Sequence, residues 1–250
     1  MDPRYEQETV AVEDRHWWYV GRRRILEGVV DSLALPGGVE ILDAGCGSGR
    51  NLEWLARFGS VKGLELSEDS LEYARRRAIG SVVAGSVEDI PLADESFDLV
   101  TSFDVIEHVD DRRALHELHR VLRPAGRLLV SVPAYPFLWS EHDARNHHRR
   151  RYTTRALLEA ARGAGFDPRW SSHFNLLLLP AAAAHRLIAG FSQPEVSSNS
   201  ERPGSSSGGS LKPAISRCAA AAGNSSRLKC ELQRGSKPAP RAASSSARVV

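Results

Sequence analysis

The sequence is poor in cysteine, carries almost no net charge and has no run of apolar residues near its N-terminus. Its three cysteines show no C-x-x-C spacing, which argues against a disulfide framework and against a cysteine zinc site. A formal net charge of +2 over 250 residues creates no strong field for nucleic acid, so we expect no nucleic-acid partner. The polar, acidic N-terminus lacks the hydrophobic region of an export signal, so we expect a cytoplasmic protein.

What the sequence does contain is a glycine-rich turn after a short apolar run at 39–42. The run predicts a buried strand, and the residues after the turn show helical spacing. A strand, a glycine turn and a helix together bring backbone amides close to a nucleotide-like ligand. Glycine suits such a turn because it tolerates positive φ and has no side chain to hold the ligand away.

The spacing of the turn narrows the choice of ligand. Glycines occupy every second position from Gly45 to Gly49, which is one residue tighter than the G-x-G-x-x-G dinucleotide fingerprint. No Lys-Ser or Lys-Thr pair follows, so the turn is not a phosphate-binding P-loop. A second predicted strand at 61–66 carries Glu65, 20 positions after Gly45, where an acid suits the two hydroxyls of a ribose.

Five segments in order carry a resemblance to a known family. They are D-A-G-C-G-S-G from Asp43, G-L-E-L-S from Gly63, and the stretches 85–92, 96–109 and 118–130. Over roughly residues 38–135 the sequence resembles class I S-adenosylmethionine (AdoMet)-dependent methyltransferases of the small-molecule/lipid type, with a methyltransferase-11-like domain. The resemblance implies an α/β fold with a Rossmann-like, doubly wound and mostly parallel sheet.

The alternation of strand and helix patterns predicts a parallel sheet independently of the resemblance. We expect strands near 39–44, 61–66, 81–84, 97–103, 127–133 and 166–174. We expect helices near 50–58, 68–78 and 111–122, and one from Thr153 to Gly163 or Gly165. The predicted parts are a lead-in at 1–35, a methyltransferase domain at 36–191 with an acceptor-side insertion near 134–152, and a tail at 192–250.

The tail is dense in Ser, Ala, Arg, Pro and Gly and has few large apolar residues. Such a segment cannot bury enough surface to offset its ordering entropy, so we expect disorder over 192–250. It is either a natural flexible tail or the frame-shifted reading of a GC-rich gene, and the other two reading frames would decide. The family's sheet normally ends in an antiparallel strand beside the fifth, and we expect the sheet to lack this strand.

The resemblance implies AdoMet as the cofactor and assigns roles to residues near the predicted strand ends. The residues expected to bind it are Asp43, Gly45, Gly47, Gly49, Glu65, Leu66, Ser86, Val87 and Asp104. Asp43 orients the glycine turn or meets the amino group, Glu65 takes the ribose hydroxyls, and Leu66 packs against adenine.

The adenine segment departs from the family pattern. Ser86 stands where the family usually has an aspartate, so adenine contact is expected to depend on Glu88 or on the backbone amide of Val87. Asp104 is expected near the methionine moiety, and capping of the next turn is the alternative for it.

The lead-in contains His16-Trp17-Trp18-Tyr19 followed by three arginines. Apolar positions recur at helical spacing from Arg22 onward, which predicts an amphipathic helix. One hypothesis is a helix packed on the domain edge with solvated arginines. The other is a lid, in which an aromatic ring covers the sulfonium and one of Arg22, Arg23 and Arg24 meets the cofactor carboxylate.

Methyl transfer needs a general base only when the acceptor must lose a proton, as a hydroxyl must. His108, after the fourth predicted strand, is one candidate base, and a structural loop histidine is the alternative. The insertion supplies His142, Asp143 and His148 as further candidates. We expect it to be a loop that forms an acceptor pocket for an anionic group, a basic surface patch, or a hinge whose Asp143 pairs with an arginine. These residues match no known metal-ligand spacing, so we predict no metal site.

The predicted function is AdoMet-dependent methylation of an unidentified small-molecule or lipid-linked acceptor. The alternatives are a non-catalytic AdoMet-binding or scaffold protein and, less favoured, a nicotinamide-dependent oxidoreductase. The apolar stretch 175–191 is interrupted by His185 and Arg186, which predicts a packed or interfacial helix rather than a membrane span. It leaves room for an amphiphilic acceptor and for peripheral contact with the inner face of a membrane.

Overall fold

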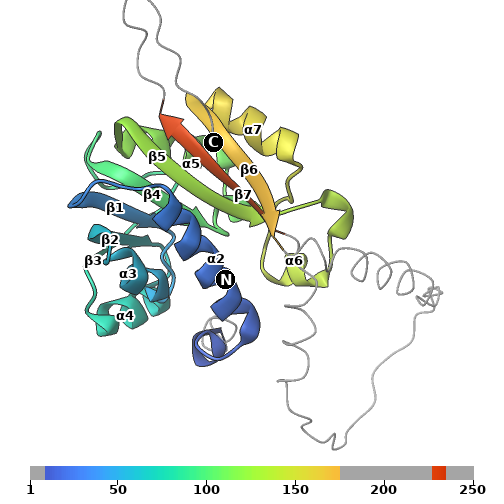
Figure 1. The fold of residues 1–250 in the computed structure, drawn as a ribbon. Coiled ribbons are helices and arrows are strands. Elements are labelled where there is room, and N and C mark those ends of the chain that lie inside the picture. The colour runs from blue at the N-terminus through green and yellow to red at the C-terminus, as the bar shows by residue number, and fades with distance from the viewer. Residues whose placement is uncertain (1–8, 175–226, 235–250) are drawn as a thin grey trace, which may run out of the picture.

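The computed structural model describes residues 9–174 and 227–234, which form one seven-stranded sheet with helices on both faces (Figure 1). The strands are β1 (Val39–Ala44), β2 (Gly59–Glu65), β3 (Ser81–Ala84), β4 (Phe97–Phe103), β5 (Leu122–Pro133), β6 (Phe166–Phe174) and β7 (Arg227–Arg234). The α-helices are α2 (Trp17–Ser32), α3 (Arg50–Leu55), α4 (Glu68–Arg77), α5 (Asp111–Val121), α6 (Glu141–Arg145) and α7 (Thr154–Gly163), and the 3-10 helices are η1 (Ile106–His108) and η2 (Pro136–Leu138).

The strand order in the sheet is β3-β2-β1-β4-β5-β7-β6. The first five strands pair in parallel, and β7 is antiparallel to both β5 and β6. This order confirms the predicted doubly wound α/β fold. β2 and β3 lie on one side of β1, and β4 lies on its other side, so the strand order reverses between β1 and β4. Ligands of such sheets bind outside the carboxyl ends of the strands where the order reverses.

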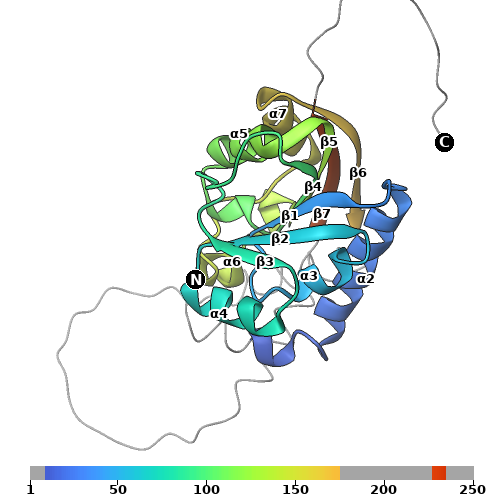
Figure 2. The same ribbon diagram turned by 90° about the vertical axis from the view of Figure 1, so that its left-hand side faces the viewer.

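Consecutive residues of the central strands enter two separate cores. Ile41 and Leu99 belong to the core under α2 and α3, whereas Leu42 and Val100 belong to the core under α5 and α7. Side chains alternate between the faces of a strand, so a sheet covered on both faces needs nearly continuous apolar runs. Figure 2 shows α5 and α7 on one side of the sheet and α2, α3 and α4 on the other.

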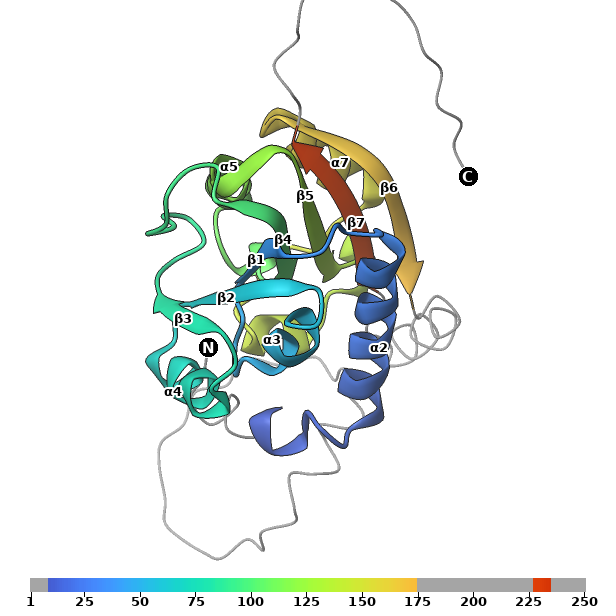
Figure 3. The same cartoon turned by 60° about the vertical axis from the view of Figure 1, so that its left-hand side comes forward.

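The predicted N-terminal helix is present, and it begins at Trp17 rather than near Arg22. His16 caps it, because its Nδ1 accepts the backbone N–H of Trp18 at 3.4 Å. Leu26 and Val30 are fully buried, which fixes the inner face of α2. Figure 3 shows α2 beside α3, so the lead-in packs next to the helix that follows the glycine turn.

The prediction that the sheet lacks its last antiparallel strand is wrong. β7 lies between β5 and β6 and pairs with β5 over residues 227–233 and with β6 over residues 227–234. Cys230 and Leu232 alternate into the core and are fully buried, opposite Val130 and Leu128. The expectation of disorder therefore fails at 227–234, while the rest of 192–250, and the predicted helix at 175–191, lie outside the described residues.

Two further boundaries differ from the prediction. β5 begins at Leu122 rather than near 127, and α3 ends at Leu55 rather than near 58. The insertion is not wholly a loop, because α6 begins after a capping box between Ser140 and Asp143. Among the helices that the structure describes, none combines the length and the apolarity that crossing a membrane requires.

Candidate active site

A cavity of about 790 Å³ opens beyond the carboxyl ends of β1, β2 and β4. The glycine turn and the ends of β2 and β4 line its floor, and residues of α2 and of the segment before it line one wall. Residues of the insertion, among them His142 and His148, line the far end. The cavity is therefore built from segments that lie far apart in the sequence.

The three glycines of the turn have different surroundings. A Cβ added to Gly45 would lie 2.3 Å from Cγ2 of Val105, whereas one added to Gly47 would meet nothing within 4 Å. Both residues have positive φ, +85° and +54°, and both line the cavity. Gly49 packs against Ala74 and lies outside the cavity lining, which corrects its prediction as a ligand contact.

The carboxylate of Glu65 lies at the tip of β2 and is held by backbone amides. Its Oε2 accepts the N–H of Gly47 at 2.8 Å, and its Oε1 accepts the N–H groups of Leu66 and Ser67 at 2.9 Å each. Glu65 and Leu66 line the cavity, and Leu66 is 69% exposed. An acid and an exposed apolar side chain thus lie next to each other in the cavity, as the G-L-E-L-S motif predicts.

The predicted adenine segment also reaches the cavity. Ser86 and Val87 line it, and the hydroxyl of Ser86 accepts the backbone N–H of Glu88 at 3.1 Å. Glu88 lies outside the lining, and its carboxylate accepts the N–H of Asp110 at 2.9 Å. Glu88 therefore does not reach the cavity, whereas Ser86 and Val87 do.

Asp104 follows β4 with a φ of +60°, which is unusual for a residue other than glycine. Its carboxylate forms an ion pair with Nη2 of Arg22 at 2.7 Å and accepts the hydroxyl of Ser131 at 3.1 Å. Strained backbone of this kind occurs frequently at ligand sites. Arg22, Arg23 and Asp104 all line the cavity, and of the two arginines it is Arg22 that pairs with Asp104, whereas Arg23 contacts Glu13 and Asp14.

The aromatic residues of the lead-in are placed unequally. Trp17 is 55% exposed and lies outside the lining, and Trp18 lines the cavity but stacks on Phe174 with 6.1 Å between the ring centroids. Tyr19 also lines the cavity. The wall formed by α2 therefore presents Tyr19 and two arginines, Arg22 and Arg23, to the cavity.

The far end of the cavity is rich in histidine. The rings of His108 and His148 lie 4.7 Å apart between centroids, and His142 lies 6.4 Å from His148. All three line the cavity. The structure thus brings together the three predicted histidines, which come from two segments separated by α5 and β5.

Asp143 does not share this position. It is fully buried, lies outside the cavity lining and accepts from Nε and Nη2 of Arg151 at 2.8 and 3.0 Å. The N–H and the hydroxyl of Ser140 also donate to it, and Nδ1 of His148 lies 2.8 Å from its Oδ1. Burial by itself raises the pKa of Asp143, but the contacts with His148 and Arg151 outweigh it and hold this pKa well below its usual range. Asp143 as a general base facing the acceptor is therefore wrong, and the pairing with an arginine is correct.

Comparison with known proteins now identifies the domain. Residues 42–130 match the family described as a methyltransferase domain. The chain is 36% identical over 118 residues to the methyltransferase GfsG of Streptomyces halstedii, covering 43% of this chain and 42% of that one. It is 34% identical over 140 residues to the O-methyltransferase resE of Aspergillus sclerotiorum, covering 52% of this chain and 50% of that one. The matches thus span half or less of these relatives' own length.

A solved structure extends the comparison to the fold. The geranyl diphosphate C-methyltransferase of Streptomyces coelicolor, in a complex with Mg²⁺, geranyl diphosphate and S-adenosyl-L-homocysteine, has a TM-score of 0.63 at 20% identity. The likeness covers 92% of this chain and 84% of that chain. Residues 42–130 carry a methyltransferase domain, within a fold of the class I AdoMet-dependent type. Its fold and its glycine turn are those of the family that the sequence resembles.

In this methyltransferase domain Asp43 lies near the end of β1, two residues before Gly45 of the glycine turn. It is fully buried, lies outside the cavity lining and accepts the hydroxyl of Thr101 at 2.7 Å. Of its two predicted roles, orienting the turn is the one that this position permits. Burial raises the pKa of Asp43 to about 7, and the hydrogen bond from Thr101 offsets only part of this effect.

The raised pKa of Asp43 predicts a loss of stability as the pH rises. The pKa in the folded state lies above the ordinary value of 3.8, so the folded protein binds the extra proton between these values. This contribution is complete at low pH and is lost as the pH rises through 7. Relative to the Asp43→Asn variant, the wild type should lose about 2–3 kcal/mol of unfolding free energy between pH 5 and pH 8. Urea unfolding of both proteins at the two pH values measures this, and parallel pH profiles would contradict it.

One contact beside the cavity has no signal in the sequence. Glu13 is buried, and both of its carboxylate oxygens accept the hydroxyl of Ser48, at 2.8 and 2.9 Å. Arg77 of α4 donates to the same carboxylate at 2.6 Å. The segment before α2 is therefore tied to the glycine turn and to α4 through a single side chain.

Proposed function

We propose that this chain transfers the methyl group of AdoMet to a small-molecule or lipid-linked acceptor. The observation that carries the proposal is the contact between Glu65 and the glycine turn. The carboxylate lies 2.8 Å from the amide nitrogen of Gly47, and both residues face the same cavity. This juxtaposition suits a nucleoside whose ribose hydroxyls meet the acid while its tail lies along the turn.

The residues present fit the remaining parts of AdoMet. Nε of Arg22 is buried and has no hydrogen-bond partner among the described residues, so it is available to an anion. Arg22 would hold the carboxylate of the methionine part, and Asp104 would hold its ammonium group. The open space over Gly47 would admit the chain between sulfur and ribose, and Leu66 and Val87 would flank the adenine.

Bound AdoMet supplies a methyl group on a positively charged sulfur. The contribution of the protein is alignment and the exclusion of water. The segment around Glu13 and the wall formed by α2 close the cofactor end of the cavity, and Tyr19 places an aromatic ring on that wall. An aromatic face stabilises a nearby cation, which suits the sulfonium.

The acceptor end of the cavity supports a polar acceptor group. His108, His142 and His148 line it, and imidazole can receive a proton near neutral pH. An oxygen nucleophile is consistent with the O-methyltransferase resE among the relatives. Phe137 and Trp139 are 65% and 42% exposed on the segment after β5, which suits an amphiphilic acceptor presented at the inner face of a membrane.

Transfer of label from AdoMet tests the proposal. The protein is incubated with methyl-tritiated AdoMet and fractionated polar or lipid extracts, and the release of S-adenosylhomocysteine is followed. We expect labelled product from at least one fraction and binding of AdoMet but not of NAD. Binding of AdoMet without transfer in any fraction would leave a binding or scaffold protein, and binding of NAD instead would indicate an oxidoreductase.

A further inference from the structure

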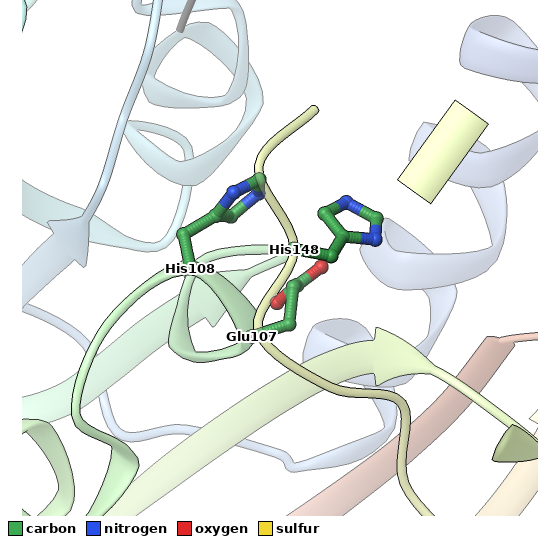
Figure 4. A group of neighbouring side chains, drawn as sticks. All are labelled: Glu107, His108 and His148. Carbon is green, nitrogen blue, oxygen red and sulfur yellow. The ribbon is translucent and has the colours of Figure 1, made fainter. Parts of the chain in front are cut away.

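Glu107 was not among the predicted site residues, yet it lies directly beside two of them. Glu107 and His108 belong to η1, and His148 follows α6. One potential ligand atom from each of the three lies within 4.8 Å of those from the other two. Figure 4 shows the carboxylate of Glu107 directed toward the two imidazole rings. Glu107 is fully buried, while both histidines line the acceptor end of the cavity.

Two imidazoles and one carboxylate form a donor set that binds divalent transition metals. Zinc enzymes use two histidines and a glutamate in this way and leave one position open for water or substrate. Ligand atoms about 2.1 Å from one ion lie roughly 3–4 Å apart. The three atoms lie within 4.8 Å of one another, so a shift of about 1 Å, within the reach of side-chain rotation, would bring them to one ion. The sequence spacing alone does not reveal this set, because His148 approaches η1 only in the folded chain.

His148 is fixed in the orientation that a metal ligand requires. Its Nδ1 lies 2.8 Å from Oδ1 of Asp143, which leaves Nε2 as the nitrogen for an ion. Asp143 is itself fixed by Arg151 and Ser140. A carboxylate behind a ligating histidine sets its tautomer and increases its basicity, and this arrangement accompanies most histidine metal ligands.

The backbone also joins the two segments of the cluster. The N–H of Arg149 donates to the carbonyl of Glu107 at 2.7 Å, and the N–H of His148 donates to the carbonyl of Asp143 at 2.9 Å. These bonds hold the residue after His148 against η1. The three side chains are therefore preorganised by contacts that do not involve an ion.

We propose that Glu107, His108 and His148 bind one divalent transition-metal ion at the acceptor end of the cavity. An open coordination position facing the cavity would bind an oxygen of the acceptor, such as a hydroxyl or a carboxylate. The part that concerns the acceptor rests on the proposed methyltransferase function. The binding of the ion does not, so the two can be tested separately.

Metal uptake by the full, untagged chain tests the site without AdoMet. After removal of metals with a chelator, Zn²⁺ is titrated calorimetrically and Co²⁺ by its visible absorption. We expect one ion per chain in the wild type and at least a 100-fold loss of affinity in Glu107→Gln, His108→Ala and His148→Ala. His116→Ala is the matched control, because His116 is an exposed histidine of α5 outside the cluster. It should bind the ion as the wild type does.

The results separate this inference from the proposed function. No stoichiometric uptake by the wild type, or uptake retained in all three cluster variants, would overturn the metal site. Circular dichroism and thermal unfolding establish that each variant is folded, and Glu107→Gln preserves the buried shape. Methyl transfer that persists in chelator, together with absent metal uptake, would leave the function intact and assign the histidines to proton transfer alone. Metal uptake without methyl transfer would leave the site intact and reject the function.

Discussion

Replacing Glu65 with alanine is expected to weaken AdoMet binding about 100-fold, measured by calorimetry with AdoMet or S-adenosylhomocysteine. A hydrogen bond to a charged group contributes about 1.5–3 kcal/mol net, so the loss of two such bonds to ribose hydroxyls at the lower end of this range costs on the order of 100-fold in affinity. The same carboxylate also holds the amide of Gly47, so its loss removes a support of the turn. We expect the effect in the dissociation constant and, in a transfer assay, mainly in KM for AdoMet.

Two further variants make this result specific. Glu65→Gln keeps the shape and one oxygen acceptor, so it should bind more weakly than the wild type but more tightly than Glu65→Ala. Glu68→Ala removes an acid near the start of α4 whose side chain is 76% exposed, and it should leave the affinity unchanged. Equal affinities of the wild type and Glu65→Ala, with both proteins folded, would remove Glu65 from the site and weaken the methyltransferase proposal.

The elements that the sequence predicts well are those whose signals are local. The apolar run of β1, the glycines after it and the acid at the tip of β2 are each visible within a few residues. Parallel strands then place their carboxyl ends at one edge of the sheet, so Glu65, Ser86 and Asp104 reach one cavity without further information. The position of Gly47 is predictable for the same reason, because adjacent residues determine the turn that directs its amide toward the cavity.

The elements that the sequence does not predict depend on distant partners. β7 has only a short alternating pattern in a segment rich in Ser, Ala and Arg, and it is stabilised by pairing with β5 and β6 on both sides. Glu13 and Ser48 are far apart in the sequence, and neither residue type indicates that the two side chains are in contact. Glu107 has no signal of its own, because an acid beside a histidine is common, and only the approach of His148 in the fold completes the three-residue cluster.

The role of Asp143 is likewise not predictable from the sequence, because it depends on the contact that Arg151 makes with it in the fold. From the sequence it is one of several polar residues in a crowded segment, and both a base and a hinge are reasonable for it. In the fold it accepts two hydrogen bonds from Arg151 with almost no solvent contact, the two side chains being 0% and 2% exposed. A carboxylate in this position orients His148 and anchors the insertion, and it has no access to an acceptor.

The buried pair therefore predicts a large and asymmetric effect on stability. Arg151→Met should lower the free energy of unfolding by about 3–5 kcal/mol, because it leaves the buried carboxylate of Asp143 without its cation. The double variant Asp143→Leu with Arg151→Met should recover much of this loss, since no uncompensated charge remains. Arg155→Met is the matched control, because Arg155 pairs with Glu159 on the exposed face of α7 and its side chain is 86% exposed. Urea unfolding of the four proteins measures the effect, and an Arg151→Met variant as stable as the control would show that the pair does not hold the insertion in place.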